Sequence, residues 1–395
     1  MKKVAGIVAE YNPFHNGHGY QIARTREALG EETAVVCAMS GSFVQRGEPA
    51  VFEKHLRARA ALLGGADLVL ELPLPWAMAS AETFARGAVE ILMSTGLVTH
   101  LSFGSECGDT TALEGIAALL LRPEMDPLIR EGLSAAGLSY AAARQRAAET
   151  LAGEPLPALA SPNDILGIEY LKSLYYVNSE IVPLAIPRAG AGHDGGGEGA
   201  YPSAAQLRRR LAEGADISAS VPPEAAALYA GGTPVFPGTL ETALLSRLRM
   251  LPDAAFAALP DASEGLHNRL SSAAREEPTL AEILAAAGTK RYPAARLRRM
   301  LWGAALGLTR EDAAGTPPYL RVLAANKRGR ALLAEMRECA TLPMVTKPAS
   351  VRELDGRANR VFALEAAATD FYSLACSDPE RRRGGGEWCS VPVML

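Results

Sequence analysis

Two histidines lie three residues apart near the start of the chain, in the segment Glu10-Tyr11-Asn12-Pro13-Phe14-His15-Asn16-Gly17-His18. An imidazole can donate a hydrogen bond to a phosphate oxygen, and donors placed where charge develops contribute much of the catalysis of nucleotidyl transfer. Gly17 has no side chain and so allows a nucleotide to approach the backbone. Metal binding and helix capping are the alternatives, although two histidines without a third ligand nearby make a poor zinc site. We predict that His15 and His18 contact nucleotide phosphates.

The elements predicted around this segment place it at the edge of a sheet. An apolar, β-branched run at residues 3–11 predicts a strand before the histidines, and a helix follows at residues 18–29. The first turn of a helix has free N–H groups and a partial positive charge, which suit an anion. Further apolar runs predict strands at residues 33–39, 67–72, 100–103 and 181–186, with helices at residues 53–63, 80–94 and 163–176. This alternation predicts an α/β fold with a Rossmann-like parallel sheet, which binds ligands outside the carboxyl ends of its strands.

The second half of the chain has a different pattern. Beyond about residue 220 it is almost wholly helical, with helices predicted at residues 240–250, 263–275, 280–287, 294–306, 320–335 and 364–374. A chain of 395 residues is too long for one ordinary core. We predict a nucleotide-binding domain at residues 1–220 with a helical insertion around residues 110–160, and an all-helical domain at residues 221–395. The glycine-dense segment 190–199 is predicted to be mobile and the segment 380–387 to be disordered.

Composition limits the class of protein. Hydrophobic residues make up 48% of the chain and charged residues 21%, as in soluble globular proteins. No apolar run reaches the roughly 18 residues of a membrane span, and the first apolar run lacks the cleavage site of a signal peptide. We therefore expect a cytoplasmic protein without a membrane partner. The cysteines are scattered, which argues against a disulfide framework and a thiolate metal site; they are Cys37, Cys107, Cys339, Cys376 and Cys389.

The charge of the chain is unevenly distributed. A net charge of −4 discourages nucleic-acid binding, yet no acidic residue occurs between Ile283 and Arg310. A local basic face of this kind suits a phosphate backbone. An ordinary solvated helix face is the alternative, and charge alone leaves both open. The basic residues concerned are Lys290, Arg291, Arg296, Arg298, Arg299 and Arg310.

The pattern His-x-Gly-His after a first strand resembles the signature of the HIGH nucleotidyltransferase superfamily. Longer strings make the chain similar to one family, the tRNA(Met) cytidine acetate ligases. The longest of them lie at residues 9–18, 39–49, 65–73 and 163–170. The shorter ones are Phe103-Gly104-Ser105-Glu106, Ile186-Pro187-Arg188, Tyr319-Leu320-Arg321-Val322-Leu323 and Ala368-Thr369-Asp370-Phe371-Tyr372. The resemblance therefore spans nearly the whole chain.

This resemblance implies a reaction in two steps. ATP, with Mg²⁺ expected, and acetate would give acetyl-adenylate and pyrophosphate, and the acetyl group would pass to N4 of the wobble cytidine of elongator tRNA(Met). The chemistry is reasonable in itself, because acetate has no leaving group and adenylation supplies one. The sequence has no glycine-rich loop of the kind that holds the pyrophosphate of acetyl-CoA, which is compatible with free acetate as the donor.

The same resemblance implies which residues bind ATP. Gly104 would let the adenine lie against bare backbone, and Asn163 and Arg188 match further nucleotide contacts of the family. A helix N-cap is the alternative for Asn163, and a surface charge is the alternative for Arg188. The main ATP segment would be Val8, Ala9, Glu10, Tyr11, Asn12, Pro13, Phe14, His15, Asn16, Gly17, His18, Gly19, Tyr20 and Gln21.

A second phosphate motif is expected where a hydroxyl-rich turn opens a helix, at Ser203-Ala204-Ala205-Gln206-Leu207-Arg208. Ser203 can cap that helix and donate to a phosphate, so it joins His15 and His18 as a predicted catalytic residue. The family has threonine where this chain has Ala205, asparagine where it has Ser42, and usually a tyrosine before the pair His193-Asp194. These departures concern the binding of pyrophosphate and not the overall reaction.

RNA binding is predicted from the acceptor and from charge. Acetylation of a cytosine N4 requires the base to leave its stack, which is easiest in a single-stranded loop. The polar loop at residues 40–51 would close over ATP or contact RNA, and the helical half would dock the tRNA. The predicted RNA-binding residues are Arg46, Lys54, Lys290, Arg291, Arg296, Arg298 and Arg299.

Two other functions stay open at the level of sequence. A metabolite nucleotidyltransferase that makes an NAD or CoA precursor would use the same His-x-Gly-His core without RNA. A non-catalytic nucleotide- or RNA-binding protein would account for the altered turn at Ser203. The oligomeric state is open as well.

Overall fold

The computed structural model describes residues 2–135, 138–189, 201–263, 265–289 and 292–395. The predicted mobile segment 190–199, His193-Asp194 within it, and the predicted RNA contacts Lys290 and Arg291 lie outside these residues. A central sheet has the strand order β10-β8-β5-β2-β1-β6-β7, with β9 paired to β8. Its strands are β1 (Val4–Ala9), β2 (Ala34–Ser40), β5 (Leu68–Leu72), β6 (His100–Ser105), β7 (Val182–Pro187), β8 (Leu320–Ala325), β9 (Met344–Val345) and β10 (Val393–Met394).

The five predicted strands are confirmed as a parallel array. β5, β2, β1, β6 and β7 lie side by side in that order, each parallel to its neighbour. The chain moves outward from β1 to β2 and β5 on one side and to β6 and β7 on the other. The strand order therefore reverses between β1 and β6, which is the position where such sheets bind ligands.

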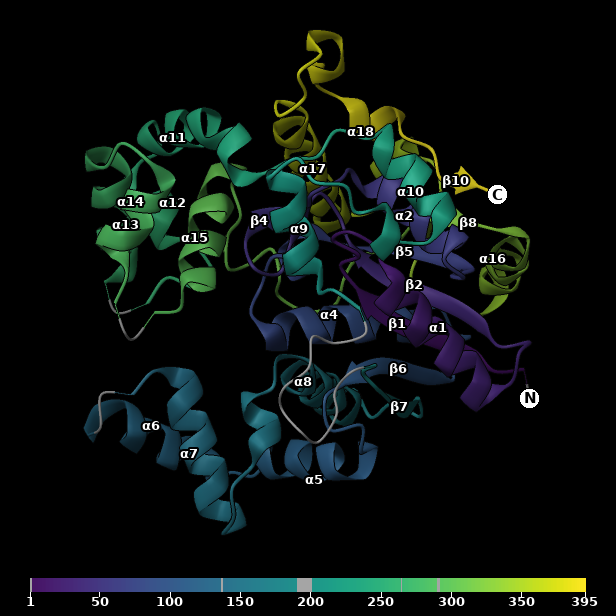
Figure 1. Cartoon of the computed structure of the whole chain (residues 1–395). Helices are drawn as coiled ribbons and strands as arrows, with labels where there is room; N and C mark the ends of the chain where they lie inside the picture. The colour runs from purple at the N-terminus through teal and green to yellow at the C-terminus, as the bar shows by residue number, and fades with distance from the viewer. Residues whose placement is uncertain (1, 136–137, 190–200, 264, 290–291) are drawn as a thin grey trace.

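Helices cover both faces of the sheet, because alternate side chains of each strand point to opposite layers. Val4, Val36 and Leu68 belong to the core of one layer, and Ile7 and Val35 to the core of the other. Helices of the first layer include α3 (Leu74–Ala77), α4 (Ala81–Ser94), α5 (Thr110–Leu120), α8 (Pro162–Tyr176), α16 (Lys327–Cys339) and α17 (Gly356–Ser373). α6 (Met125–Ala135) and α7 (Tyr140–Ala152) pack against each other, and α7 packs against α5, so the two helices extend this layer away from the sheet (Figure 1). The second layer holds α1 (Asn16–Leu29), α2 (Lys54–Leu63), α9 (Ala204–Ala212) and α10 (Pro223–Ala230).

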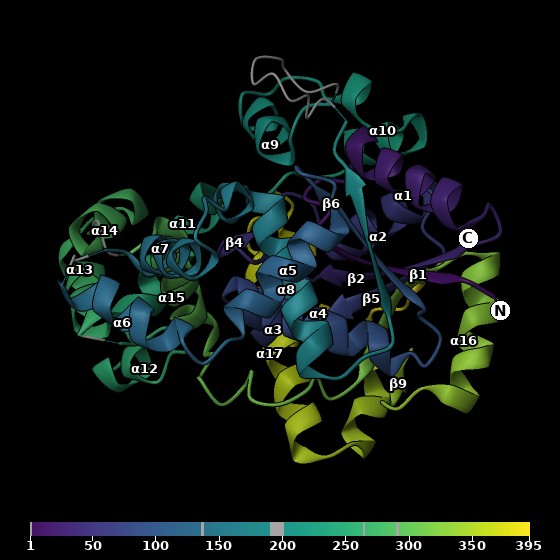
Figure 2. The same ribbon diagram turned by 90° about the horizontal axis from the view of Figure 1, so that it is seen from below.

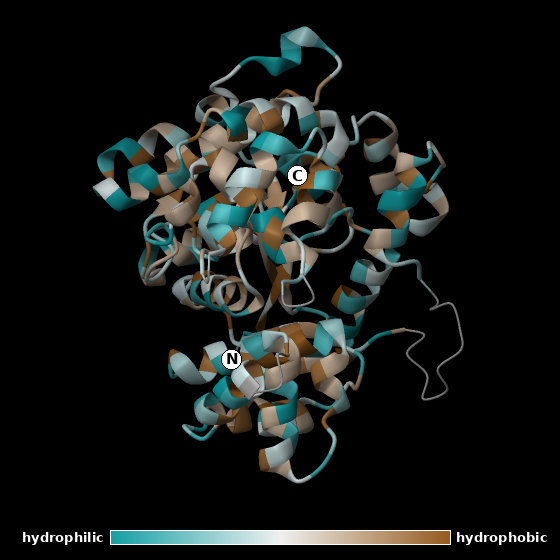
Figure 3. Cartoon of the chain, turned by 90° about the vertical axis from the view of Figure 1, so that its left-hand side faces the viewer, coloured by the Kyte–Doolittle hydropathy of each residue, from teal (hydrophilic) through white to brown (hydrophobic). Residues whose placement is uncertain are grey.

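A separate group of helices packs around its own core beside the sheet (Figure 1). Phe256, Leu270 and Trp302 are fully buried in that core. Hydrophobic and hydrophilic residues alternate along the helical ribbons of the molecule (Figure 3), and packing buries the apolar residues of this group. The group comprises α11 (Glu241–Arg249), α12 (Asp253–Ala257), α13 (Leu266–Glu276), α14 (Leu280–Ala287) and α15 (Ala294–Leu306).

The chain does not stay helical after this group, which corrects the prediction of an all-helical C-terminal region. Residues 320–325 form β8, antiparallel to β5, and β10 pairs with β8, so both termini lie on the same side of the molecule near α16 (Figure 1, Figure 2). The helix predicted at residues 320–335 is therefore wrong over its first turn and a half. Every residue of β8 is buried, and a short apolar run of this kind does not distinguish a strand from a buried helix.

The segment predicted to be disordered is ordered. Residues 380–387 contribute to a 3-10 helix (Pro379–Arg382) and to α18 (Gly386–Cys389). The side chain of Glu387 is fully buried and pairs with Lys54 and Arg321. Its partners lie far away in the sequence, so local composition gave no sign of them.

Within the residues described, no helix is long and apolar enough to cross a membrane. The five cysteines are free thiols, of which Cys37 is buried and Cys107 and Cys389 are exposed.

Candidate active site

A cavity of about 610 Å³ opens at the carboxyl ends of β1 and β6, where the strand order reverses. A short hairpin of β3 (Phe43–Val44) and β4 (Glu48–Pro49) forms part of its wall. The structure brings most predicted ATP residues to this cavity, namely Val8, Ala9, Glu10, Tyr11, Asn12, His15, His18, Gln21, Gly104, Asn163, Arg188 and Ser203. The predicted residues that do not line it are Pro13, Phe14, Asn16, Gly17, Gly19 and Tyr20.

The two histidines form a stacked pair at the start of α1, with ring centroids 3.8 Å apart. Nδ1 of His15 accepts a hydrogen bond from the N–H of Gly17 at 3.0 Å, and Nδ1 of His18 accepts one from the N–H of His15 at 3.2 Å. This reciprocal capping box commits both Nδ1 atoms as acceptors. In a neutral imidazole the proton then lies on Nε2, so each ring has one N–H donor left for a ligand.

The electrostatic setting keeps both rings neutral in the absence of a ligand. Burial, assisted by the nearby Arg188 charge, lowers the pKa of His15 from 6.5 to about 4. Burial lowers the pKa of His18 well below 6.5, and His15 and Arg188 add to the effect. Arg188 therefore lies close to both rings. Two N–H donors and a guanidinium facing one cavity are suited to an oligophosphate.

Gly17 has a different structural role from the one predicted. A Cβ at this position would lie 2.9 Å from Cε1 of His15, so the ring of His15 occupies the space that a side chain would need. Glycine at this position allows the capping box to form. Gly104 has more space beside it, because among the described residues the one atom within 4 Å of an added Cβ is Cγ of Arg188 at 3.8 Å. Bare backbone of Gly104 thus faces the cavity.

The loop between β1 and α1 is fixed by bonds from several elements. Asn12 accepts a hydrogen bond from the N–H of Val51 at 2.7 Å through its side chain, and from Arg208 at 2.9 Å through its carbonyl. The N–H of Phe14 donates to the hydroxyl of Tyr229 at 2.9 Å. A loop held in this way presents its donors without reorganisation, which is the condition for electrostatic catalysis.

Hydrogen bonds to two carboxylates connect the end of β6 to the start of α8. The carboxylate of Glu106 accepts from the backbone N–H of Asp164 at 2.9 Å and from the side chain of Asn163. The carboxylate of Asp164 accepts from the N–H of Glu106 at 2.9 Å and from the hydroxyl of Ser105. Asn163 is thus not the N-cap of α8, and its amide is anchored at the cavity wall.

Ser203 is the N-cap of α9, as its position before the helix predicts. Its oxygen accepts from the N–H of Gln206 at 3.2 Å, and the side chain of Gln206 accepts from the N–H of Ser203 at 2.7 Å. The hydroxyl proton of Ser203 is not used in this box and has no acceptor among the residues that the structure describes, and Ser203 lines the cavity. One turn further, Arg208 also lines the cavity.

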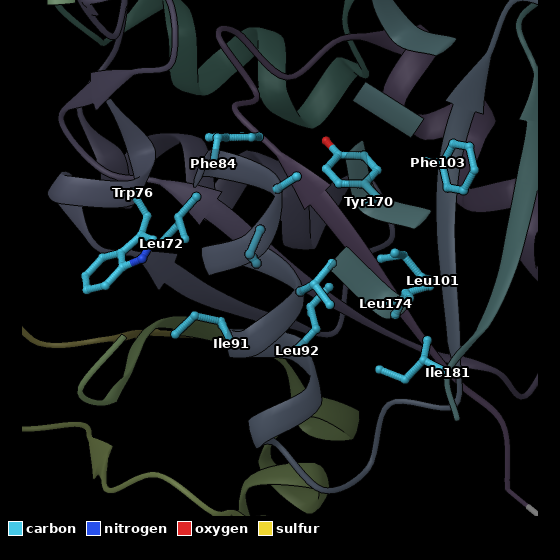
Figure 4. Close-up of a cluster of buried hydrophobic side chains, with 14 of the residues drawn as sticks. Leu72, Trp76, Phe84, Ile91, Leu92, Leu101, Phe103, Tyr170, Leu174 and Ile181 are labelled. Atoms are coloured by element: carbon cyan, nitrogen blue, oxygen red, sulfur yellow. The ribbon is translucent and has the colours of Figure 1, made fainter. Parts of the chain in front are cut away.

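Several cavity residues had not been singled out from the sequence. The cavity wall also contains Gln45, Glu48, Phe84, Tyr170 and Arg208. Gln45, Glu48, Tyr170 and Arg208 lie within strings that resemble the family, and this resemblance is the signal that could have found them. Phe84 lies on α4 outside those strings, and no local pattern distinguishes it from a core residue. Figure 4 shows Phe84, Tyr170 and Phe103 along one side of a hydrophobic cluster, and all three also line the cavity.

The predicted RNA-binding residues have different surroundings. Arg46 is exposed at the cavity rim. Lys54 is 3% exposed and forms ion pairs at 2.7 Å with Glu71 and with Glu387. The prediction for Lys54 is therefore wrong, because its charge is enclosed and already paired.

The arginines of α15 are exposed in part but have intramolecular partners. Arg298 pairs with Glu48 at 3.0 Å, and Arg299 pairs with Asp261 at 3.1 Å. Arg296 donates to the carbonyl of Asp261 at 2.8 Å. The basic face of this helix is thus partly neutralised from within the chain. Among the residues described, no group of three or more His, Cys, Asp or Glu side chains is placed to hold a metal ion.

Comparison with known proteins agrees with this geometry. The family model described as HIGH Nucleotidyl Transferase matches residues 1–386. The chain is 37% identical to the tRNA(Met) cytidine acetate ligase of Acetivibrio thermocellus, with 100% of both chains covered. It is 41% identical to the protein of the same name from Syntrophotalea carbinolica, over 87% of this chain and 84% of that protein.

Solved structures are similar over the same extent. The structure of Thermotoga maritima TmcAL bound with alpha-thio ATP is 33% identical, covers 100% of this chain and 99% of its own, and superposes with a TM-score of 0.91. The apo form of that protein has a TM-score of 0.92. The chain described here is therefore a member of the HIGH nucleotidyltransferases and, among them, of the tRNA(Met) cytidine acetate ligase family.

Proposed function

We propose that this protein acetylates the wobble cytidine of elongator tRNA(Met) with ATP and acetate, through acetyl-adenylate. The observation that carries the proposal is the stacked pair of His15 and His18. Both rings line one cavity together with Arg188, and this cavity lies where the strand order reverses between β1 and β6. The end-to-end similarity to named acetate ligases supports the reaction, and the relative solved with an ATP analogue supports ATP as a substrate.

In the first step a carboxylate oxygen of acetate attacks the α-phosphorus of ATP and pyrophosphate leaves. Negative charge grows on the phosphate oxygens, and the Nε2–H groups of His15 and His18 are placed to bind it. Arg188 and the hydroxyl of Ser203 extend the set of donors towards the departing pyrophosphate. Gly104 and Asn163 line the same cavity at the end of β6 and the start of α8, where we place the adenosine.

Mg²⁺ enters this proposal as the usual companion of ATP, on which it keeps phosphate and water ligands. The described residues contain no cluster of three metal-ligating side chains, so we assign no protein ligand to the ion. In the second step the acetyl group moves to N4 of the cytidine, and Arg46 at the cavity rim is the basic residue best placed to meet the RNA. Docking on α15 stays a prediction. We place the protein in the cytoplasm, with its substrates.

The comparisons do not favour the two alternatives from the sequence. A metabolite nucleotidyltransferase or a non-catalytic binding protein would not require end-to-end similarity to tRNA ligases. The decisive experiment is mass spectrometry of nucleosides from bulk unmodified tRNA incubated with the protein, ATP and labelled acetate. We expect labelled N4-acetylcytidine that depends on ATP and not on CoA. Acetylation that requires acetyl-CoA, or none at all, would contradict the proposal.

A further inference from the structure

Glu10 is an acidic side chain in the wall of the cavity. It belongs to the segment for which the family resemblance implies ATP binding, but an ionised carboxylate only accepts hydrogen bonds and so cannot donate to the phosphates. It follows β1 directly and lines the cavity. Its Oε1 accepts a hydrogen bond from the N–H of Gln45 at 2.9 Å. Its Oε2 has no hydrogen-bond partner within the part of the chain that the structure describes. The other cavity acid, Glu48, is instead paired with Arg298 at 3.0 Å.

Three arginines lie near Glu10, and they are different from Arg188, the arginine near the histidines. Burial raises the pKa of Glu10, and the nearby guanidiniums of Arg208, Arg46 and Arg57 oppose that rise. Arg57 donates to the backbone carbonyls of Phe52 and Ser40, and Arg208 donates to the carbonyl of Asn12, so both are engaged.

Arg46 is exposed at the rim, and its guanidinium has no hydrogen-bond partner among the described residues. The cavity therefore has two groups of polar side chains in its wall. His15, His18 and Arg188 form one of them, and Glu10 forms the other together with Arg46.

An aromatic wall adjoins the Glu10 part of the cavity. Phe84 and Tyr170 both line it. Burial, and then the charge of Glu10, raise the pKa of the Tyr170 hydroxyl, so the two groups are neighbours. The Tyr170 ring packs edge to face on Phe103 with centroids 5.9 Å apart. The Phe84 and Tyr170 rings are both almost wholly buried, so they give this part of the cavity an apolar wall against which a flat base could pack.

The polar groups match one base edge. Cytosine presents the N4 amino donor beside two acceptors, N3 and O2. A carboxylate accepts from N4–H in protein contacts to cytosine. An arginine presents several N–H donors in a fixed fork, which suits the adjacent acceptors. Uracil has an acceptor at the place of N4, so a carboxylate there would disfavour it.

We propose that Glu10 is a catalytic residue of acetyl transfer: it binds N4 of the acceptor cytosine and removes a proton from it, while Arg46 binds the N3 and O2 edge. This inference rests on the proposed function. N4 attacks the carbonyl carbon of acetyl-adenylate, and a C–N bond forms. The bond from that carbon to the phosphate oxygen breaks, and AMP leaves with its electron pair. The proton lost from N4 goes to the free Oε2 of Glu10 and then to solvent.

The test separates the two half-reactions. Acetate-dependent exchange of labelled pyrophosphate into ATP, without RNA, reports adenylation. Single-turnover transfer from enzyme preloaded with ATP and labelled acetate to an elongator tRNA(Met) anticodon stem-loop reports the second step. The variant is Glu10→Gln, whose amide oxygen still accepts from the N–H of Gln45. The matched control is Glu82→Gln, which removes an exposed acid next to the cavity that pairs with Lys172.

We expect Glu10→Gln to slow transfer by about 10²- to 10⁴-fold and to slow exchange far less, because the Glu10 carboxylate is not a donor to the phosphates. The transfer rate of wild type should rise with pH through the pKa of Glu10, and the variant should lose that inflection. Arg46→Gln should raise the RNA concentration for half-maximal transfer by about tenfold and leave exchange unchanged.

Equal losses in both assays would assign Glu10 a merely structural role and overturn the inference, and so would full transfer by Glu10→Gln. A thermal melt of the variant shows whether an equal loss reflects unfolding. If the melt is lowered, the pH profile of residual transfer decides, because a retained inflection also overturns the inference. Wild-type protein that exchanges pyrophosphate but acetylates no RNA would instead overturn the proposed function itself.

Discussion

Polar and charged side chains are buried in two regions of this protein, and the two regions differ in whether their donors and acceptors face a cavity or face each other. One is the cavity with its histidines and Glu10. The other is a buried ion cluster formed by Lys54, Glu71, Arg321, Glu365 and Glu387, which joins α2, the sheet, α17 and α18. In the cavity, Nε2 of each histidine and one oxygen of Glu10 face open space. In the cluster, cations and acids face each other.

The cluster balances its charges internally. Lys54 and Arg321 face the carboxylates of Glu71 and Glu387. Burial and the neighbouring Glu71 raise the pKa of Glu365 well above its usual range, and Tyr319 donates to it at 3.0 Å. A protonated Glu365 leaves two positive and two negative charges. Nε and Nη1 of Arg321 and Oε1 of Glu365 have no hydrogen-bond partner among the described residues, but these atoms are buried and do not line the cavity. The two regions therefore differ in access: the cluster is enclosed, whereas the donors and acceptors of the cavity can meet a ligand.

Removal of Lys54 should have the largest effect on stability. Lys54→Met leaves Glu71 and Glu387 buried without their shared cation, which costs about 3–5 kcal/mol of unfolding free energy. Arg46→Met, the matched change at an exposed arginine of the same loop region, should alter stability by less than about 0.5 kcal/mol. Urea unfolding at neutral pH measures both. Similar stabilities for the two variants would show that the cluster does not differ from a surface charge.

Removal of a histidine donor should have the largest effect on catalysis. His18→Asn and His15→Asn each remove one Nε2 donor, and we expect pyrophosphate exchange to fall by about 10²- to 10³-fold. Asparagine remains a good N-cap at position 15, so unfolding free energy should change little. Lys54→Met should show the reverse pattern, with stability lost and residual exchange per folded molecule retained. Full exchange activity in both histidine variants would make the site assignment wrong.

The comparison of the two regions also explains which features could be predicted from the sequence and which could not. Strands β1, β2, β5, β6 and β7 follow from apolar runs bounded by turns, and His15, His18 and Ser203 follow from their position before helices. These are local signals. β8 and Glu387 depend on partners hundreds of residues away, so local pattern predicted a helix and a disordered tail in their place. Lys54 and Arg46 look alike in the sequence, and only burial separates their roles.

The pH dependence of stability should report the cluster. Burial alone would raise the pKa of Glu387, but Lys54 and Arg321 lower it from 4.5 to about 2. A lowered pKa stabilises the fold above the unfolded value of 4.5, and that stability is lost as the pH falls from 4.5 towards 2. The loss of unfolding free energy from this one group is about 3 kcal/mol at most.

This effect is measured as a difference between two proteins. Urea unfolding of wild type and Glu387→Gln at stepped pH should show their stability difference shrinking below about pH 4.5. Glu365→Gln is the control inside the cluster, because Glu365 is already protonated in the folded protein. The stability difference between wild type and Glu365→Gln should therefore not shrink below about pH 4.5. A constant difference between wild type and Glu387→Gln down to acid pH would show that Glu387 is not held ionised by Lys54.

The smallest expected effect is a fraction of a proton at the active site. In the free protein the pKa of His15 is lowered from 6.5 to about 4 by burial and Arg188, so its stabilisation is lost as the pH falls from 6.5 through about 4. Bound phosphates favour the imidazolium and should raise that pKa, so ATP binding takes up a proton at a pH between the free and bound values. Calorimetric titration near pH 5.5 in two buffers of different ionisation enthalpy measures the uptake. His15→Asn removes this contribution and leaves the titration of ATP itself unchanged, so the difference between the two proteins isolates the ring. Equal proton uptake by wild type and His15→Asn would mean that the phosphates do not reach His15, and the distinction between a ligand-binding cavity and a self-contained ion cluster would then rest on His18 alone.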